Sequence, residues 1–229
     1  MLLSTWRPLV LSLLLLAATS ASPVSNASDF EFLRVPESAS EAPRPAPKYQ
    51  FMYGLQGRWP GPVRWRYNHA NAPSPFDADP AGTLAKVRAA FDSWTQVCGV
   101  TYVYEGETSI APNARMGSQP DYVNVVGWAQ LEGTRSGEAW VWYSDDPPEW
   151  LDGDIILSVD RVRSDGEMRR TATHEWGHVL GLDHSNLNGA LMSGDPHSSY
   201  NSLSALQADD VRGCRCIYGA AAHSPAGFS

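Results

Sequence analysis

Three histidines and one glutamate stand at spacings that suit a catalytic metal site. His174 and His178 are four residues apart, so on a helix both rings lie on one face and can bind the same ion. Glu175, beside the first ligand, can hold a water at that ion and act as a general base. His184 lies ten residues after His174, beyond a helix end that Gly181 permits. Three histidines leave a fourth zinc position open, as in catalytic sites.

The residues around these positions resemble a known family of zinc peptidases. The string from His174 to His184 is similar to the zinc-binding signature of the metzincins, and Ser185 directly after it resembles the matrixin branch, the matrix metalloproteinase-like enzymes. Further along, Leu191-Met192 resembles the methionine turn that lies beneath the zinc, and residues 206–219 resemble the matrixin terminal helix.

This resemblance, close over residues 171–219, implies an α+β fold of the metzincin type. We expect a twisted mixed sheet with two helices above a zinc cleft and a C-terminal helix below. Gly181 and Met192 are expected to support the site, and the resemblance implies that Asp209 and Asp210 brace the methionine turn and accept the amino group freed by pro-segment removal. Asp210 falls on the apolar face of its helix, where an unpaired carboxylate is unfavourable. A buried partner is therefore expected, the alternative being an acid at the edge of that face.

The function implied is that of a secreted zinc-dependent endopeptidase acting on protein or peptide substrates. Peptide bonds would be hydrolysed by a zinc-activated water with Glu175 as general base. An extended substrate would pair with an edge strand, for which residues 138–142 are the candidate. Two alternatives are a non-catalytic zinc-containing binding module and a toxin-like effector. Retention of Glu175 argues against the first, because a structural zinc needs no base and has a fourth protein ligand.

Composition limits the partners. The 229 residues include 43% hydrophobic residues, enough for one globular domain, and carry a net charge of −8. No basic run is present, so we infer no nucleic-acid or anionic-membrane partner. No segment reaches the 18 or more apolar residues of a membrane span, so we expect no membrane anchor and a monomer.

The chain divides into four predicted parts. Residues 1–21 have positive charge, an apolar stretch and small residues near Ala21, as a secretory signal peptide does, which predicts an extracellular protein. Residues 22–50 read as a Pro/Ser-rich linker or short pro-segment. Residues 51–219 form the predicted catalytic domain, and residues 220–229 a flexible tail.

Residues 22–50 are the segment in which we look for a group that keeps the enzyme inactive. Matrixins usually block the zinc with a pro-domain cysteine, but residues 22–50 contain none. A carboxylate such as Asp29 or Glu31 could occupy the open zinc position instead. The alternative is that both acids are simply solvated.

Periodicity and capping signals predict the elements that position the site. Alternation predicts a strand at 63–67, and an apolar stripe after Asp79-Pro80 predicts a helix ending near Cys98-Gly99. Ser164 with Glu167 predicts a helix that runs to Leu180, and Ser204 with Gln207 predicts a last helix that ends near Tyr218. Further strands are predicted at 100–104, 122–126, 139–143 and 155–159.

The remaining histidines and one acidic segment are the other candidates for metal ligands. His69, His197 and His223 have no ligand spacing, so one catalytic Zn²⁺ is expected. Five carboxylates lie within residues 145–154: Asp145, Asp146, Glu149, Asp152 and Asp154. They supply the oxygen ligands that Ca²⁺ prefers, but they match no EF-hand loop, and a solvated turn is the favoured explanation.

Three cysteines in an exported chain suggest one disulfide and one thiol. Cys98 ends the first predicted helix, while Cys214 faces inward on the last helix and Cys216 faces elsewhere. We favour the pairing of Cys98 with Cys214. By the chain-entropy model, closing this loop would stabilise the fold by about 4–5 kcal/mol.

Overall fold

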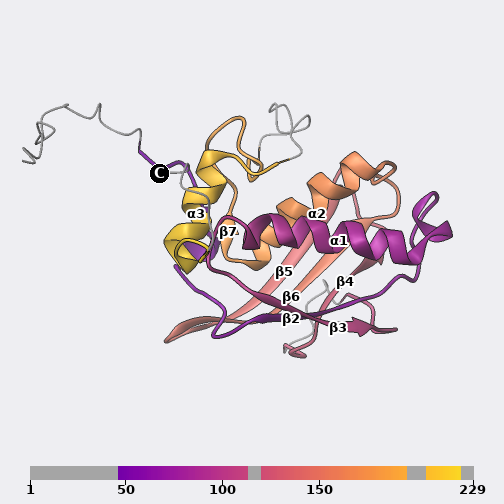
Figure 1. The fold of residues 1–229 in the computed structure, drawn as a ribbon, viewed down its shortest axis with the longest axis horizontal. Coiled ribbons are helices and arrows are strands. Elements are labelled where there is room, and N and C mark those ends of the chain that lie inside the picture. The colour runs from indigo at the N-terminus through magenta and orange to yellow at the C-terminus, as the bar shows by residue number, and fades with distance from the viewer. Residues whose placement is uncertain (1–45, 113–119, 195–204, 223–229) are drawn as a thin grey trace, which may run out of the picture. The chain divides into compact units, whose positions relative to one another are not determined.

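A five-stranded mixed sheet forms one layer of the domain (Figure 1). The computed structural model describes residues 46–112, 120–194 and 205–222. The strand order is β3-β2-β4-β6-β5, with β5 running antiparallel to β6 and the other neighbours parallel, so the predicted mixed sheet is confirmed. The strands are β2 (Val63–Tyr67), β3 (Tyr102–Glu107), β4 (Asn124–Ala129), β5 (Gly137–Asp145) and β6 (Pro148–Ser158).

Most strand centres were predicted, but their ends were not. The strands predicted at 100–104 and 122–126 begin two residues later, and the last two strands extend into a hairpin that joins Asp145 to Pro148. Alternation marks residues with one buried face and says little about where backbone pairing stops. The long hairpin leaves β5 at the edge of the sheet.

Two helices pack on one face of the sheet (Figure 1). α1 (Pro80–Thr95) begins at Asp79, whose side chain accepts from Gly82 N at 2.9 Å, as the Asp-Pro signal predicts. α2 (Asp165–Val179) begins at Ser164, whose hydroxyl accepts from Glu167 N at 3.3 Å. Both predicted helix starts are confirmed, and the α+β class with them.

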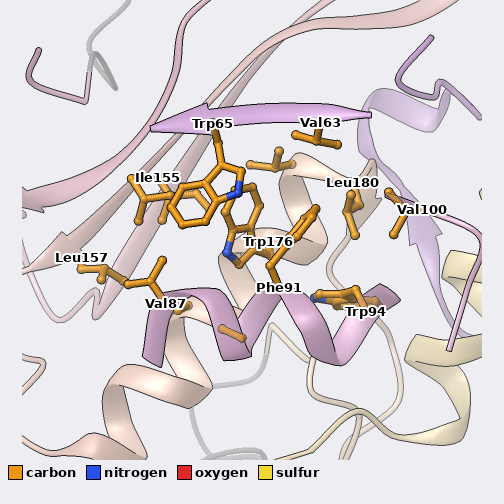
Figure 2. Close-up of a cluster of buried hydrophobic side chains, with 14 of the residues drawn as sticks. Val63, Trp65, Val87, Phe91, Trp94, Val100, Ile155, Leu157, Trp176 and Leu180 are labelled. Carbon is orange, nitrogen blue, oxygen red and sulfur yellow. The ribbon is translucent and has the colours of Figure 1, made fainter. Parts of the chain in front are cut away.

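The core between the sheet and these helices is largely aromatic. Trp65 of β2, Phe91 of α1 and Trp176 of α2 are fully buried and meet there (Figure 2). The ring centroids of Trp65 and Trp176 lie 5.5 Å apart, and those of Phe91 and Trp176 lie 4.2 Å apart. Large rings contribute strongly through buried area and fill space without gaps. Trp176 therefore fixes the orientation of α2, the helix that carries His174, Glu175 and His178.

A short two-stranded sheet lies at the C-terminal end of α2. β1 (Gln50–Phe51) pairs antiparallel with β7 (Leu182–Asp183), and a 3₁₀ turn, η1 (Met52–Gly54), follows β1. Asn186 N also donates to Lys48 O at 3.0 Å. The packed part of the chain thus includes residues 48–50, which the sequence placed in the linker. Another 3₁₀ turn, η2, spans Phe76–Ala78.

The last helix, α3 (Ala208–Tyr218), starts differently from the prediction. Gln207 is the residue that precedes the helix, and its backbone N–H donates to the Asp210 carboxylate at 2.7 Å. The expected start at Ser204 was wrong because Gln207 is itself the N-cap and forms a capping box with Asp210, three residues later. Ser204 lies outside the described residues.

A disulfide joins α3 to the end of α1. Cys98 and Cys214 are bonded, with their Cα atoms 5.9 Å apart, so the favoured pairing is confirmed. Cys216 is an exposed free thiol. The predicted signal peptide at 1–21 lies outside the described residues, and within the described ranges no helix has the length and apolar character to cross a membrane.

Candidate metal centre

The structure brings the three predicted histidines together. His174 and His178 project from α2, and His184 follows β7. One ring nitrogen of each lies within 4.8 Å of the others, and within the described ranges no other group of three His, Cys, Asp or Glu side chains is gathered this way. His174 and His178 are buried, whereas His184 is exposed. His184 is therefore the member of the cluster that solvent reaches.

Backbone carbonyls fix the protonation of the two buried rings. His174 Nδ1 donates to Leu191 O and His178 Nδ1 donates to Leu182 O, both at 2.7 Å. A carbonyl only accepts, so in each ring Nδ1 carries the proton and Nε2 is the unprotonated nitrogen of a neutral imidazole. The two Nε2 atoms are 3.1 Å apart. Two bare nitrogens cannot bond to each other, but they can share a cation.

The electrostatics favour these neutral rings. Burial, reinforced by the neighbouring His178 ring, lowers the pKa of His174 well below its usual range. Burial and the His184 ring likewise lower the pKa of His178 to about 4. Both rings are consequently neutral near pH 7, as a metal ligand must be.

The donor set fits zinc. Two nitrogens bound to one zinc at about 2.0–2.1 Å and a tetrahedral angle lie roughly 3.3–3.4 Å from each other. The distance between His174 Nε2 and His178 Nε2 is close to this value. Metal-binding histidines ordinarily donate their other ring N–H to a carbonyl or carboxylate, which both rings do here.

Gly181 turns the chain between the second and third histidines. Its φ is 101°, a left-handed conformation that residues with a Cβ rarely adopt. A Cβ there would also stand 2.8 Å from Trp150 Nε1. Gly181 N donates to His178 O at 2.9 Å, which closes the helix and lets β7 deliver His184 from another direction.

Glu175 lies beside the cluster and is buried, with 6% of its surface exposed. Burial raises the pKa of Glu175 to about 8, with Glu138 adding to the rise and Arg135 opposing it. Within the described part of the chain, no hydrogen bond reaches its carboxylate. The edge strand is close, because a Cβ on Gly137 would stand 2.7 Å from Glu175 Oε1. A buried carboxylate without donors holds protons tightly and can exchange one with a neighbour.

An ion pair beside Glu175 was not foreseen from the sequence. Arg135 Nη1 contacts Glu138 Oε1 at 2.5 Å, and the Glu138 side chain is 19% exposed. Glu138 was predicted only as the start of a substrate-pairing strand, and Arg135 not at all. Only the pairing of β5 with β6 beside α2 brings these residues to Glu175, more than 35 positions away in sequence.

The turn at Leu191-Met192 lies against α2 and is held by Asp210. The two backbone N–H groups of Leu191 and Met192 donate to the Asp210 carboxylate at 2.9 and 3.0 Å. Leu191 then accepts from the His174 ring. Met192 is 1% exposed, and a Cβ on Gly177 would stand 2.3 Å from its sulfur. Asp210 thus connects α3 to a metal ligand through one backbone turn, and it has the buried partners that its position on the helix predicts.

Asp209 holds the segment that follows the third histidine. It is fully buried and accepts the Ser185 hydroxyl at 2.7 Å. Its other oxygen accepts from Lys48 N at 3.2 Å and pairs with Arg212 at 3.1 Å. Ser185 N donates to Met192 O at 2.7 Å, so Asp209 and Asp210 anchor adjacent parts of one backbone network.

Comparison with known sequences agrees with this arrangement. The family description Matrixin, of the M10 peptidases, matches residues 64–219. The chain belongs to the matrixin family. The match covers most of the part that the structure describes, including the upstream strands and α1, where no sequence motif was clear.

Individual relatives are modestly similar. This matrixin chain is 31% identical over 168 residues to matrix metalloproteinase-19 of Homo sapiens, covering 68% of this chain and 30% of that protein. It is 30% identical over 142 residues to the hatching enzyme of Paracentrotus lividus, covering 58% and 22%. It is 36% identical over 78 residues to matrilysin of Mus musculus, covering 32% and 30%. The aligned part thus spans less than a third of each of these relatives.

The acidic residues considered for calcium are not gathered in this matrixin domain. Asp145 and Asp146 are exposed at the hairpin turn, whereas Asp152 and Asp154 are buried within β6. Asp152 accepts from two backbone N–H groups, those of residues 121 and 122, and Asp154 from Val125 N at 2.7 Å. Calcium therefore remains a prediction without an assembled ligand set. His69 Nδ1 lies 3.1 Å from the Tyr67 hydroxyl, and His197 and His223 lie outside the described residues.

Proposed function

We propose that this matrixin is a secreted zinc-dependent endopeptidase. The observation that carries the proposal is the pair of bare Nε2 atoms of His174 and His178, 3.1 Å apart and each oriented by a backbone carbonyl. His184 completes a set of three nitrogen ligands. Three protein ligands, with a carboxylate beside them, suit a catalytic rather than a structural zinc.

Glu175 is the proposed general base. When bound, zinc supplies Lewis-acid polarisation of the substrate carbonyl and of a water molecule. The Glu175 carboxylate accepts the proton of the attacking water and then donates it to the leaving amine. Its pKa of about 8 in the metal-free site reflects burial, and a nearby cation would lower that value toward neutrality or below. Glu175 can therefore serve as base first and acid second.

An extended peptide is the proposed substrate form. β5 is the outer strand of the sheet and pairs with β6 on one side only. An edge strand offers unpaired backbone N–H and C=O groups, to which a peptide can add as a further strand. Gly137 of β5 approaches the Glu175 carboxylate, so a peptide along this edge would pass the reactive groups. This extends the predicted pairing segment, residues 138–142, by one residue.

The setting is proposed to be extracellular. The signal-like segment at 1–21 and the disulfide between Cys98 and Cys214 support export, because disulfides persist in oxidising compartments. One relative is named a matrix metalloproteinase, so proteins of the extracellular matrix are candidate substrates.

The direct test is digestion of a mixed peptide library by the purified protein, with and without a strong zinc chelator, read by mass spectrometry. The proposal predicts cleavage at internal bonds that the chelator abolishes and added zinc restores. Protein that carries zinc yet cleaves no peptide would favour the non-catalytic binding module instead.

A further inference from the structure

A stacked pair of tyrosines, Tyr53 exposed and Tyr143 half-buried, lies beside the segment that leads into the metal centre. Tyr53 of η1 has 55% of its surface exposed and a φ of 55°, an unusual conformation for a bulky residue. Its ring stacks on that of Tyr143 in β5, with centroids 4.7 Å apart and an interplanar angle of 26°. Exposed aromatic side chains held in a fixed position are typical of binding surfaces rather than of folding cores.

Backbone pairing holds Tyr53 in place from two sides. Met52 N, directly before it, donates to Gly181 O at 2.9 Å, and β1 pairs with β7. Tyr143 is backed by the buried Trp150, whose ring centroid lies 5.8 Å away. The pair therefore links the edge strand β5 to the segment that leads into His184. It occupies the far end of β5 from Gly137, which lies beside Glu175.

A carboxylate accompanies the tyrosine pair. Asp183 of β7 is paired with Gln50 of β1, three residues before Tyr53. Burial first, then Tyr143 and Asp183, raise the pKa of the Tyr53 hydroxyl. One Asp183 oxygen accepts from His184 N at 2.6 Å. Throughout the described ranges, no Lys or Arg forms an ion pair with Asp183. The end of β5 is acidic as well, since Asp145 is exposed there and the whole chain carries a net charge of −8.

We propose that Tyr53, Tyr143 and Asp183 form a subsite for a basic side chain of the peptide substrate. A guanidinium or ammonium group would lie against the tyrosine rings as a cation–π contact and face the Asp183 carboxylate. An apolar side chain would also fit the rings, but it would leave the carboxylate unpaired. The charge around the pair therefore favours arginine or lysine. This inference rests on the proposed peptidase function and adds a sequence preference to it.

The distance along β5 places this preference away from the scissile bond. Tyr143 is four residues beyond Ala139 and six beyond Gly137, or about 13–20 Å at roughly 3.3 Å per residue. A long basic side chain shortens that distance. The subsite therefore reads a residue about three to five positions from the bond that is cut, on one side of it.

The test uses paired peptides that differ in charge alone. A peptide cut in the library digestion is remade with arginine, or its neutral isostere citrulline, at each of five positions on either side of the bond. We expect the arginine form to have a kcat/KM higher by roughly five- to twentyfold at one position on one side, combining a cation–π contact with an exposed ion pair. The preference should shrink as salt rises from 0.05 to 0.5 M.

Variants then assign the preference to these residues. Asp183→Asn keeps an acceptor for His184 N and should bring the arginine/citrulline ratio close to one, while Tyr53→Leu should lower it two- to fivefold. Tyr122→Leu is the matched control, because Tyr122 is another exposed tyrosine with positive φ, and it should leave the ratio unchanged. Zinc content is measured in each variant, and the ratio compares two substrates on the same enzyme, so partial loss of zinc does not alter it.

The outcomes separate the two proposals. Cleavage with an arginine/citrulline ratio near one at every position overturns the basic subsite and leaves the peptidase function standing. A preference for norleucine over both would show an apolar subsite and also overturn it. A preference that Asp183→Asn and Tyr53→Leu both retain would place recognition elsewhere. Absence of any cleavage by zinc-loaded protein would overturn the peptidase function and this inference with it.

Discussion

Glu175 and Asp210 are both buried carboxylates close to the metal centre, but their surroundings differ. Asp210 accepts from the backbone N–H groups of Leu191, Met192 and Gln207. Glu175 accepts no hydrogen bond from any described residue. Burial raises the pKa of both acids, and for Asp210 the backbone donors oppose that rise. Backbone donors hold the Asp210 carboxylate in place, whereas the Glu175 carboxylate, which has no such donors among the described residues, can exchange a proton.

Asp210 has a structural role at the metal centre, whereas the role proposed for Glu175 is chemical. Asp210 organises a backbone turn that in turn orients the His174 ring, so its effect on the metal is indirect. Glu175 stands next to the ligands and beside the edge strand, where substrate and water would meet it. Replacing each acid by its amide should therefore damage different properties of the protein.

The largest effect is expected from Glu175→Gln. The amide cannot accept the proton of the attacking water, so peptide turnover should fall about 10²–10⁴-fold while zinc content and fold are retained. Turnover is measured with a peptide from the library digestion, and zinc by elemental analysis of the same sample. Glu107→Gln, an exposed acid at the end of β3, is the control. Equal zinc with unchanged turnover would show that Glu175 is not the base.

Asp210→Asn should instead reduce stability. The amide group places N–H hydrogens where the carboxylate accepted backbone N–H groups, so at least one buried donor loses its partner. We expect the free energy of unfolding to fall by about 2–4 kcal/mol in urea denaturation. Asp77→Asn, at an exposed position in η2, should change it by less than about 0.5 kcal/mol. If Asp210→Asn abolished turnover without loss of stability, the distinction between the two acids would be wrong.

The pH dependence of the metal-free protein sharpens the same contrast. The pKa of Glu175 is about 8 in the folded state, above its ordinary value of 4.5, so between these values the folded state holds a proton that the unfolded state does not. Protonated Glu175 therefore stabilises the folded state at low pH, and this contribution is lost as the pH rises through 8. From pH 8 to 6.5, wild type should gain about 1–2 kcal/mol relative to Glu175→Gln.

Thermal or urea unfolding of chelator-treated protein at both pH values measures this gain. The histidines are the same in wild type and variant, so their contribution cancels in the comparison. If the stability of wild type and of Glu175→Gln changed in parallel with pH, the pKa of Glu175 would not be raised, and the description of Glu175 as a buried carboxylate without hydrogen-bond donors would be wrong.

The smallest effect is expected from Met192→Leu. The backbone of Met192 is held by Asp210, and its side chain packs against α2 at Gly177. Leucine is nearly the same volume, so the variant should keep zinc and measurable turnover and lose less than about 1.5 kcal/mol of stability. Loss of zinc from a folded Met192→Leu protein would show that the thioether, rather than the turn held by Asp210, supports the metal.

The sequence predicted the parts of the site that depend on local geometry. Spacing along one helix and a glycine after it identified His174, His178 and His184, and the helical position of Asp210 predicted a buried partner. The disulfide was chosen because Cys214 faces inward. These inferences need only the period of a helix and the conformations that glycine allows.

What the sequence could not predict depends on contacts between distant segments. The carbonyls of Leu182 and Leu191 that fix the histidine tautomers are backbone atoms, which leave no mark on residue type. The stacking of Tyr53 on Tyr143 requires the pairing of β1 with β7, a two-residue ladder too short to give a periodic signal. The start of α3 was misplaced because Gln207 is the N-cap and Asp210, which also supports the turn at Leu191, completes its capping box.

Glu175 has its proposed role only if the three histidines hold one ion, so the zinc content of the washed protein tests the central claim most directly. The protein is purified without chelator, dialysed against metal-free buffer and assayed for zinc and for chain concentration. The account predicts close to one zinc per chain, lost when His178 is replaced by alanine. A value near zero or near two per chain in the unmodified protein would contradict it.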